Sequence, residues 1–383
     1  MDTSDPLYSS KNNCAGCRAC MEVCPKSCIS MVEDKEGFVY PHIAEDKCVD
    51  CHLCEKTCPI KAPHGNFIIK SYVGVHTQEQ VFKSASGGAF WALCELLIPM
   101  GYAVVGVKFT SDFQVVHDIA FSLQEAEQFR KSKYVMANTN GIFKRVKKLI
   151  RNGHKVMFTG TPCEVAACKK VIGDSPNLLL IDLVCHGAPN QGIFDKEIEF
   201  LQTKYNGKCS FFEFRNKQPL SGNINSRSVR YVVNGKEYIS TIGKDPFLKG
   251  YYSRLFNRPS CMECQFANPK RVGDITLADA WHVDEIYSDL DELSGVSSLL
   301  FNTEKGLSFL PYLIKKLHLR EVPVKWAVSS NEQLQHPTVS HKNRSLFFEC
   351  VNEGGIAHAV DKATRRTFLT RLINKVCRIL RSR

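Results

Sequence analysis

The feature that most constrains this chain is a run of nine cysteines between Cys14 and Cys58. Eight of them form two copies of the spacing C-x2-C-x2-C-x3-C-P, which end at Cys24-Pro25 and Cys58-Pro59. In this spacing three thiolates cover one side of a cuboidal iron–sulfur cluster, and the fourth, fixed by proline, ligates the other cluster. We therefore predict one [4Fe–4S] cluster on Cys14, Cys17, Cys20 and Cys58, and a second on Cys48, Cys51, Cys54 and Cys24.

A pair of zinc sites is the alternative for this block. Zinc knuckles usually present two C-x2-C pairs, whereas each run here has four cysteines and ends in Cys-Pro, so iron–sulfur ligation is favoured. Cys28 belongs to neither set and is predicted to be a buried, inert thiol.

The compartment and the partners are constrained by two further features. Residues 1–13 are polar and lack the apolar centre of a secretion signal, and no apolar run reaches the ~18 residues of a spanning helix. We expect a cytoplasmic chain with reduced thiols. The net charge of +11 indicates an anionic partner, although much of the excess lies in residues 362–383.

Behind the cysteine block, residues 66–320 alternate strand-like and helix-like stretches, which predicts a mixed α/β domain. An Asn234-Gly235 turn predicts a hairpin between residues 227–233 and 236–241. Strands are expected at residues 68–75, 102–109, 155–159 and 178–184, and helices at residues 86–100 and 139–151 and from the end of a turn at residues 160–163 to about residue 172.

Four more cysteines are candidate metal ligands. In open α/β sheets the loops after the strands carry the site, and here two such loops hold Cys163 and Cys185. The pair Cys261-x2-Cys264 supplies two further thiols. A C-x2-C pair is a weak signal, and Cys163 and Cys185 are equally well explained as small core residues, so spacing alone leaves a third metal site open.

The segment Ser84-Ala-Ser-Gly-Gly88 precedes a predicted helix. Backbone N–H groups and the helix dipole at such a point favour an anion such as phosphate. Serine and glycine are also common helix N-caps, and the residues alone favour that simpler interpretation.

Several separated motifs of the body resemble the beta subunits of coenzyme F420-reducing hydrogenase and F420H2 dehydrogenase. The cysteine block in front of them resembles the bacterial two-cluster ferredoxin. The motifs that carry the first resemblance run from about residue 72 to residue 281: Tyr72-Val-Gly74, Ser86-Gly-Gly88, Lys131-Ser-Lys-Tyr134, Gly160-Thr-Pro-Cys-Glu164, Asp182-Leu-Val-Cys-His-Gly187, Phe214-Arg-Asn-Lys217, Arg258-Pro-Ser-Cys-Met-Glu-Cys264 and Asp274-Ile-Thr276.

The resemblance implies an α+β fold in which a small ferredoxin domain with two [4Fe–4S] clusters precedes a mixed α/β flavin-binding domain of the F420-hydrogenase beta-subunit type. We expect the ferredoxin domain at residues 1–65, the family's N-terminal domain at 66–150 and its C-terminal domain at 151–325. A C-terminal extension with a basic amphipathic helix would follow at 326–383.

The resemblance also implies cofactors, and no catalytic residue is assigned. Members of the family bind FAD, and their cluster cysteines fall on Cys163, Cys185, Cys261 and Cys264, which makes these the expected ligands of a third [4Fe–4S] cluster. The positions expected near the flavin are Ser86, Gly87, Gly88, Lys133, Tyr134, Thr159, Gly160 and Thr161. Lys133 is expected to stabilise the anionic reduced flavin as an electrostatic donor.

Two departures from the family pattern concern the substrate. The sequence reads Ala278-Asp-Ala-Trp281 where the family usually has Gly-Asp-Phe-Trp, and the serine that often follows the Lys-Tyr element is missing from residues 135–138. These departures leave open whether coenzyme F420 is the substrate.

The expected function is that of an iron–sulfur flavoprotein oxidoreductase. It would transfer electrons between a hydride carrier, coenzyme F420 or another organic substrate, and the ferredoxin-type clusters. The alternative is an electron-transfer subunit that has no substrate of its own and feeds a partner enzyme. A nucleic-acid enzyme is disfavoured because the body has no basic stripe with interleaved aromatic residues.

The basic tail is the last feature. Apolar residues between Leu369 and Leu380 recur at helical spacing among arginines and lysines. A basic amphipathic helix of this kind can lie on an anionic membrane surface, which would place the chain on the inner face of the membrane. Docking on the body or on a partner protein is the alternative.

Overall fold

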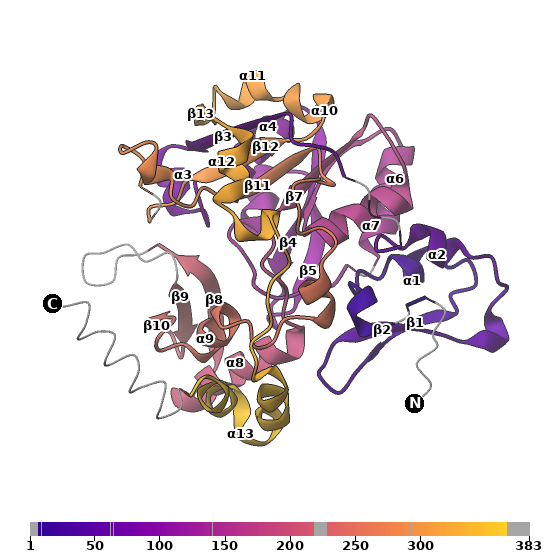
Figure 1. Ribbon diagram of the computed structural model, residues 1–383, viewed down its shortest axis with the longest axis vertical. Coiled ribbons are helices and arrows are strands. Elements are labelled where there is room, and N and C mark those ends of the chain that lie inside the picture. The colour runs from indigo at the N-terminus through magenta and orange to yellow at the C-terminus, as the bar shows by residue number, and fades with distance from the viewer. Residues whose placement is uncertain are drawn as a thin grey trace.

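The computed structural model describes residues 7–8, 10–61, 63, 65–139, 141–217, 228–291 and 293–365. Figure 1 shows three parts: an N-terminal module at the right, a large sheet with its helices at the top, and a smaller sheet packed on helices at the bottom. The C-terminal residues 366–383, which include most of the predicted amphipathic helix, lie outside the described residues.

The N-terminal module contains two similar halves. Helices α1 (Ala19–Val23) and α2 (Leu53–Thr57) each follow a residue in the left-handed conformation, Arg18 with φ 63° and His52 with φ 55°. Short 3-10 turns, η1 (Lys11–Asn13) and η2 (Glu45–Lys47), precede the two halves. A hairpin lies between them, formed by the antiparallel pair β1 (Ile29–Glu33) and β2 (Val39–Ile43).

The large sheet has eight strands in the order β13-β3-β12-β11-β7-β6-β4-β5. Its centre is parallel, because β4 pairs with β6, β6 with β7 and β7 with β11, and the outer pairs are antiparallel. The strands are β3 (Lys70–Val75), β4 (Tyr102–Phe109), β5 (Val115–Ala120), β6 (Lys155–Gly160), β7 (Leu178–Leu183), β11 (Ile275–Asp279), β12 (Ser297–Phe301) and β13 (His318–Val322).

Helices cover both faces of this sheet, and successive side chains along β4 point to opposite faces. Val104 belongs to the apolar cluster under α4 (Ala89–Leu97), whereas Ala103 and Val105 belong to the cluster under α6 (Ile142–Arg151) and α7 (Pro162–Ile172). The helices α6 and α7 lie between the sheet and the N-terminal module (Figure 1). Short helices complete the sheet's surroundings: α3 (Gln78–Phe82), α5 (Leu123–Ala126), α10 (Glu304–Leu307), α11 (Leu310–Leu313) and α12 (Val324–Ser329).

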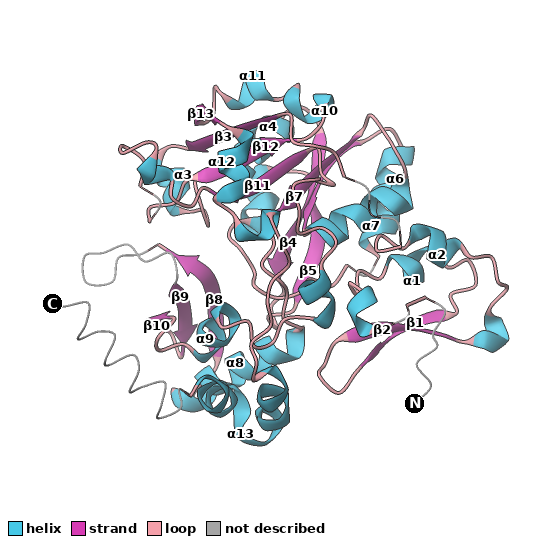
Figure 2. Cartoon of the chain, viewed as in Figure 1, coloured by secondary structure: helices cyan, strands magenta, loops and turns pink. Residues whose placement is uncertain are grey.

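The smaller sheet has the order β10-β9-β8, and the predicted hairpin at Asn234-Gly235 is confirmed by the pairing of its two strands. Figure 2 shows this sheet separate from the large one and next to helices at the bottom of the molecule. The elements are β8 (Cys209–Asn216), β9 (Ser228–Val233), β10 (Lys236–Thr241), α8 (Gln191–Lys204), α9 (Pro246–Tyr252) and α13 (Arg344–Thr364).

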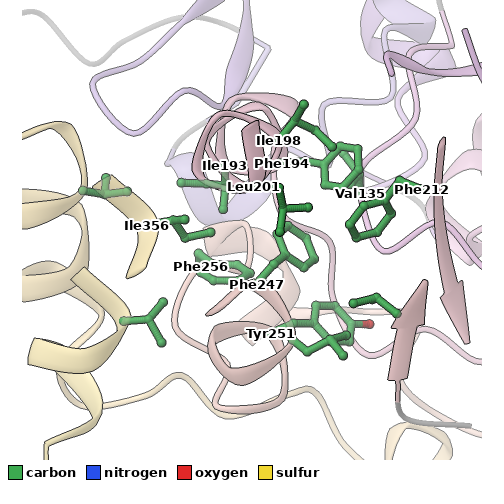
Figure 3. Close-up of a cluster of buried hydrophobic side chains, with 14 of the residues drawn as sticks. Val135, Ile193, Phe194, Ile198, Leu201, Phe212, Phe247, Tyr251, Phe256 and Ile356 are labelled. Carbon is green, nitrogen blue, oxygen red and sulfur yellow. The ribbon is translucent and has the colours of Figure 1, made fainter. Parts of the chain in front are cut away.

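An aromatic core joins the smaller sheet to these helices. The ring of Phe194 lies 5.0 Å from that of Phe212 and 5.6 Å from that of Phe247. Figure 3 shows Phe256 and Ile356 on the side of the same core that faces α13. Each fully buried side chain of this size contributes about 1.5–3 kcal/mol, so the core holds the smaller sheet and the C-terminal helix together.

The large sheet combines strands from the two predicted halves of the body. β3, β4 and β5 come from residues 66–150 and share one sheet with strands from residues 151–325: β3 lies between β13 and β12, and β4 and β5 form the opposite edge. The predicted boundaries at 65, 150 and 325 stay predictions. In the part of the chain described here, no helix combines the length and apolar character that crossing a membrane requires.

One buried pair in the aromatic core should make stability depend on pH. The carboxyl groups of Glu197 and Asp245 are both buried and lie against each other. Burial raises the pKa of Glu197 well above its usual value, and burial raises the pKa of Asp245 to about 7. One oxygen of each carboxyl group accepts a backbone N–H, and the second oxygen of each group has no other hydrogen-bond partner. A proton shared by the two carboxyl groups would supply the missing hydrogen bond.

We expect Glu197→Gln to stabilise the protein at alkaline pH. Between about pH 4 and pH 7 the unfolded chain releases protons that the folded chain keeps, so wild-type stability falls as the pH rises. A glutamine amide would donate a hydrogen bond to an ionised Asp245 and so remove this loss of stability. We expect the free energy of unfolding of the variant to exceed that of the wild type by about 1–2 kcal/mol at pH 8 and to differ little from it at pH 5. Anaerobic thermal melts at both pH values measure the difference. The exposed Glu199→Gln, on the same helix, is the control and should show no such pH dependence.

Candidate functional site

The first thiol set lies inside the N-terminal module. The pKa of Cys17 is raised well above its usual value by burial, and then by the nearby Cys20, Cys14 and Cys58. Burial and the charges of Cys14 and Cys58 raise the pKa of Cys20 to about 12. The structure therefore brings the Cys58 thiol, from the second run, to the three thiols of the first run, as crossed ligation requires.

The second thiol set lies nearer to the surface. Cys24, Cys48 and Cys54 pack in one small apolar cluster, and the exposed Cys51 raises the pKa of Cys54 in addition to burial. The buried Cys28 also belongs to this cluster, and its Sγ lies 3.3 Å from that of Cys24. Cys28 is buried as predicted, and it contacts the ligand set directly, which the sequence did not indicate.

The third thiol set is assembled from three loops of the body. Gly160 and Asp182 are paired at the ends of the parallel strands β6 and β7, and Cys163 and Cys185 each follow three residues later. Cys261 and Cys264 lie in the 3-10 turn η4 (Pro259–Glu263) and just after it. Burial is the first cause that raises the pKa of all four thiols, and the charges of neighbouring members of the set raise it further for Cys163, Cys185 and Cys261.

The chemistry of the first and third sets fits a thiolate cluster. Neighbouring thiols in these two sets raise one another's pKa, so they are costly to ionise alone, and a cationic iron centre would stabilise their thiolates. Within the described residues, no three His, Cys, Asp or Glu side chains converge closely enough to chelate a single metal ion. A cuboidal cluster instead holds its four thiolates at separate corners.

A cavity of about 430 Å³ lies beside the third thiol set. Its size falls within the range of small-molecule sites. Four groups of residues line it: Cys163, Cys185, Cys261 and Cys264; Asn12, Ala15 and Ile60 from the N-terminal module; Ser86, Gly88, Lys133 and Tyr134; and Thr159, Gly160 and Thr161. The structure thus brings seven of the eight predicted flavin positions to one cavity.

Gly87, the eighth predicted position, does not line the cavity. A Cβ atom on Gly87 would lie 2.4 Å from the carbonyl oxygen of Gly74 and 2.5 Å from the backbone nitrogen of Ser297. The glycine therefore allows the segment before α4 to approach β3 and β12 closely.

Lys133 and Tyr134 have protein partners. The ammonium of Lys133 donates to the carbonyl oxygens of Gln128 at 2.9 Å and Arg130 at 2.7 Å. Burial lowers the pKa of Lys133 to about 7. The ring of Tyr134 stacks on that of Tyr251 with centroids 4.4 Å apart. Both residues shape the cavity wall, and the electrostatic role of Lys133 toward a flavin stays a prediction.

An ion pair that the sequence did not single out lies at the same cavity. Arg215 donates to both oxygens of Asp279, at 2.7 and 3.0 Å, and also to the carbonyl oxygen of Ala85. The charge of Arg215 is the main influence that lowers the pKa of Asp279 against the cost of burial. Arg215 belongs to the family motif Phe214–Lys217, and Asp279 belongs to the segment Ala278–Trp281, which differs from the family pattern. The ion pair therefore joins these two segments. Sequence position gave no sign that they pair across 64 residues.

The N-terminal module is fixed to the body near its first thiol set. Thr139 donates its hydroxyl to the carbonyl oxygen of Cys17 at 2.7 Å. The carboxylate of Glu22 accepts the backbone N–H groups of Gly141 and Lys144, both at 2.9 Å, at the N-terminal end of α6. A carboxylate at this end of a helix is favoured by the helix dipole.

Comparisons with known proteins match two parts of the chain to families. Residues 153–325 match the family of the C-terminal region of the "Coenzyme F420 hydrogenase/dehydrogenase, beta subunit", and residues 13–62 match the "4Fe-4S dicluster domain". The body of the chain, at residues 153–325, therefore belongs to the coenzyme F420 hydrogenase/dehydrogenase beta-subunit family and follows a 4Fe-4S dicluster domain. This confirms the family resemblance and makes the chain an iron–sulfur electron-transfer protein of that family, with a mixed α/β body.

The curated relatives of this family member cover its N-terminal module. "Ferredoxin 7Fe" of Hydrogenibacillus schlegelii is 41% identical over 59 residues, 14% of this chain and 69% of the relative. The "Ferredoxin" of Mycolicibacterium smegmatis is 44% identical over 45 residues, 12% of this chain and 38% of the relative. The chain thus spans a little over two thirds of the first relative and well under half of the second.

Among solved structures, a chain of the F420-reducing [NiFe] hydrogenase complex from Methanosarcina barkeri is similar to this beta-subunit family member. The sequences are 14% identical, the alignment covers 79% of this chain and 92% of the other, and the TM-score is 0.46.

Proposed function

We propose that this protein is a flavin-dependent oxidoreductase with three [4Fe–4S] clusters. The observation that carries the proposal is the cavity that joins the predicted flavin residues to the third thiol set. A bound FAD would exchange a hydride with an organic substrate and exchange single electrons with the clusters. Coenzyme F420 or another hydride carrier is the proposed substrate class, and a redox protein is the proposed partner.

Two polar atoms without partners support a ligand in the cavity. The hydroxyl oxygen of Thr159 and Nε of Arg215 are buried and have no hydrogen-bond partner among the described residues. Both residues line the cavity. Buried polar atoms are costly when left unpaired, so a cofactor with polar ring atoms would satisfy them. Thr159 would position such a ring, and the Arg215–Asp279 pair would hold the wall opposite β6 in place.

The second candidate is an electron-transfer subunit with no substrate of its own. The exposed Cys51 in the second thiol set favours contact with a partner protein at that end of the molecule. The two candidates differ in what the cavity holds, because a subunit that only relays electrons needs no polar ligand site beside the third set.

Cofactor content tests the proposal. We expect anaerobically purified and reconstituted protein to hold about twelve iron atoms per chain, four for each cluster, together with one FAD. Cys185→Ala should lose about four iron atoms and keep the N-terminal clusters, because its thiol belongs to the third set alone. Iron analysis, EPR and the flavin absorption spectrum measure these quantities.

The control variant is Cys168→Ala, which removes a buried thiol of α7 outside the three sets. It should leave iron and flavin unchanged. Protein with its iron but no flavin after reconstitution would favour the relay subunit. If Cys185→Ala kept all its iron, the third cluster would be excluded.

A further inference from the structure

We infer that Arg258 is the shared counter-charge of the first N-terminal cluster and the third cluster, and that it sets their reduction potentials. The third cluster belongs to the function proposed above, whereas the first is the cluster on Cys14, Cys17, Cys20 and Cys58. The inference rests on where the guanidinium lies, on its contacts and on its missing ion partner.

Arg258 joins the two thiol sets through its contacts. Its Nε donates to the carbonyl oxygen of Cys14 at 2.7 Å, and its own carbonyl oxygen accepts the N–H of Cys261 at 3.0 Å. Arg258 also lines the cavity beside the third thiol set. One residue therefore contacts a cysteine of the first set and a cysteine of the third set.

The N-terminal module closes around the guanidinium. Nη2 donates to the carbonyl oxygen of Val39 at 2.8 Å, and the group lies 4.3 Å from the centre of the Tyr40 ring. Gly16 makes room for it, because a Cβ there would lie 2.7 Å from Nη1. The side chain is 1% exposed, which makes it one of the largest fully buried side chains in the described part of the protein.

No carboxylate among the described residues forms an ion pair with this buried cation. The other buried arginines of the described body differ: Arg271 pairs with Asp182, Arg215 with Asp279 and Arg130 with Glu127. An uncompensated buried charge is strongly unfavourable. Carbonyl oxygens and an aromatic face offset part of this cost, and the negative charge of thiolate-ligated clusters on either side would offset the rest.

The expected consequence is a shift in potential. Reduction adds one electron and therefore one negative charge to a cluster, and a nearby cation stabilises the more negative form. Net charge and hydrogen bonding around a cluster are among the main determinants of its potential. Arg258 should hold the potential of the first cluster above the value it would have without the charge.

The experiment is an EPR-monitored redox titration of the full chain with its clusters. Arg258→Gln, which removes the charge, should move the midpoint potential of the N-terminal cluster at Cys14 to more negative values. Arg258→Lys, which keeps it, should stay closer to the wild type. Arg344→Gln is the matched control, because Arg344 also ties the module to the body, through two hydrogen bonds to Glu36, without the contacts to Cys14 and Cys261 that Arg258 makes.

The outcomes distinguish an effect of the Arg258 charge from an effect of weaker contact between the N-terminal module and the body. A shift in Arg258→Gln without one in Arg344→Gln supports the inference, whereas an unchanged potential or equal shifts in both variants overturn it. If Arg258→Gln takes up no N-terminal cluster, uptake by Arg258→Lys supports the role of charge, and failure of both variants contradicts it. The titration reads the N-terminal cluster, so it remains decisive even for protein that binds no flavin.

Discussion

Replacing Cys58 with alanine should abolish the [4Fe–4S] cluster whose other ligands come from the first cysteine run. The structure places the Cys58 thiol with Cys14, Cys17 and Cys20, although Cys58 is the last cysteine of the second run. A [4Fe–4S] cluster is held by four cysteine thiolates, and a cluster that lacks one of them releases iron. We expect one of the two N-terminal EPR signals to disappear, which is a complete loss rather than a partial one.

Two matched variants identify the cluster that is lost. Cys20→Ala should remove the same signal as Cys58→Ala, and Cys51→Ala should remove the other one. Cys94→Ala, a fully buried thiol in α4, should change neither. If Cys58→Ala resembled Cys51→Ala instead, each run would ligate its own cluster and the crossed assignment would be wrong.

Replacing Arg271 with methionine should lower the free energy of unfolding by about 3–5 kcal/mol. Arg271 is 1% exposed and its Nη2 lies 3.0 Å from a carboxylate oxygen of Asp182, which is 0% exposed. The same guanidinium donates to the carbonyl oxygens of Phe266 at 2.8 Å and Leu183 at 3.2 Å. Methionine would leave Asp182 buried without its cation and would free the loop that follows Cys264.

Anaerobic thermal and denaturant melts measure this effect. The control is Arg320→Met, which breaks an exposed ion pair with Asp289 that solvent screens. It should leave the melting temperature nearly unchanged. A loss of stability in Arg271→Met no larger than that in Arg320→Met would show that the buried pair does not hold the loop.

Local sequence determined the elements whose signals are short-range. The turn at Asn234-Gly235 and the strand Tyr102–Phe109 formed where turn residues and β-branched runs predicted them. The helix expected from residue 86 begins only at Ala89, because Gly88 takes a left-handed φ of 93° and Gly87 before it packs against β3 and β12. That approach depends on strands far along the chain, which local patterns do not show.

The candidate site also has a part that local sequence predicted and a part that depends on distant segments. The spacing of eight cysteines and their prolines predicted two cluster sites, because their ligands follow one another along short turns. For the third thiol set, spacing left the site open and the family resemblance suggested it, since its cysteines are spread over residues 163–264 and the loops of Cys163 and Cys185 meet only when β6 and β7 pair in the large sheet.

By itself, the sequence determined that this chain gathers thiolates near its N-terminus and that strands and helices alternate behind them. The tertiary structure alone decided that Arg215 meets Asp279 at the cavity and that Arg258 lies between two thiol sets without a carboxylate. The physical reason is that turn geometry and side-chain alternation are local, whereas the partner of a buried charge is chosen when distant segments pack together and exclude water.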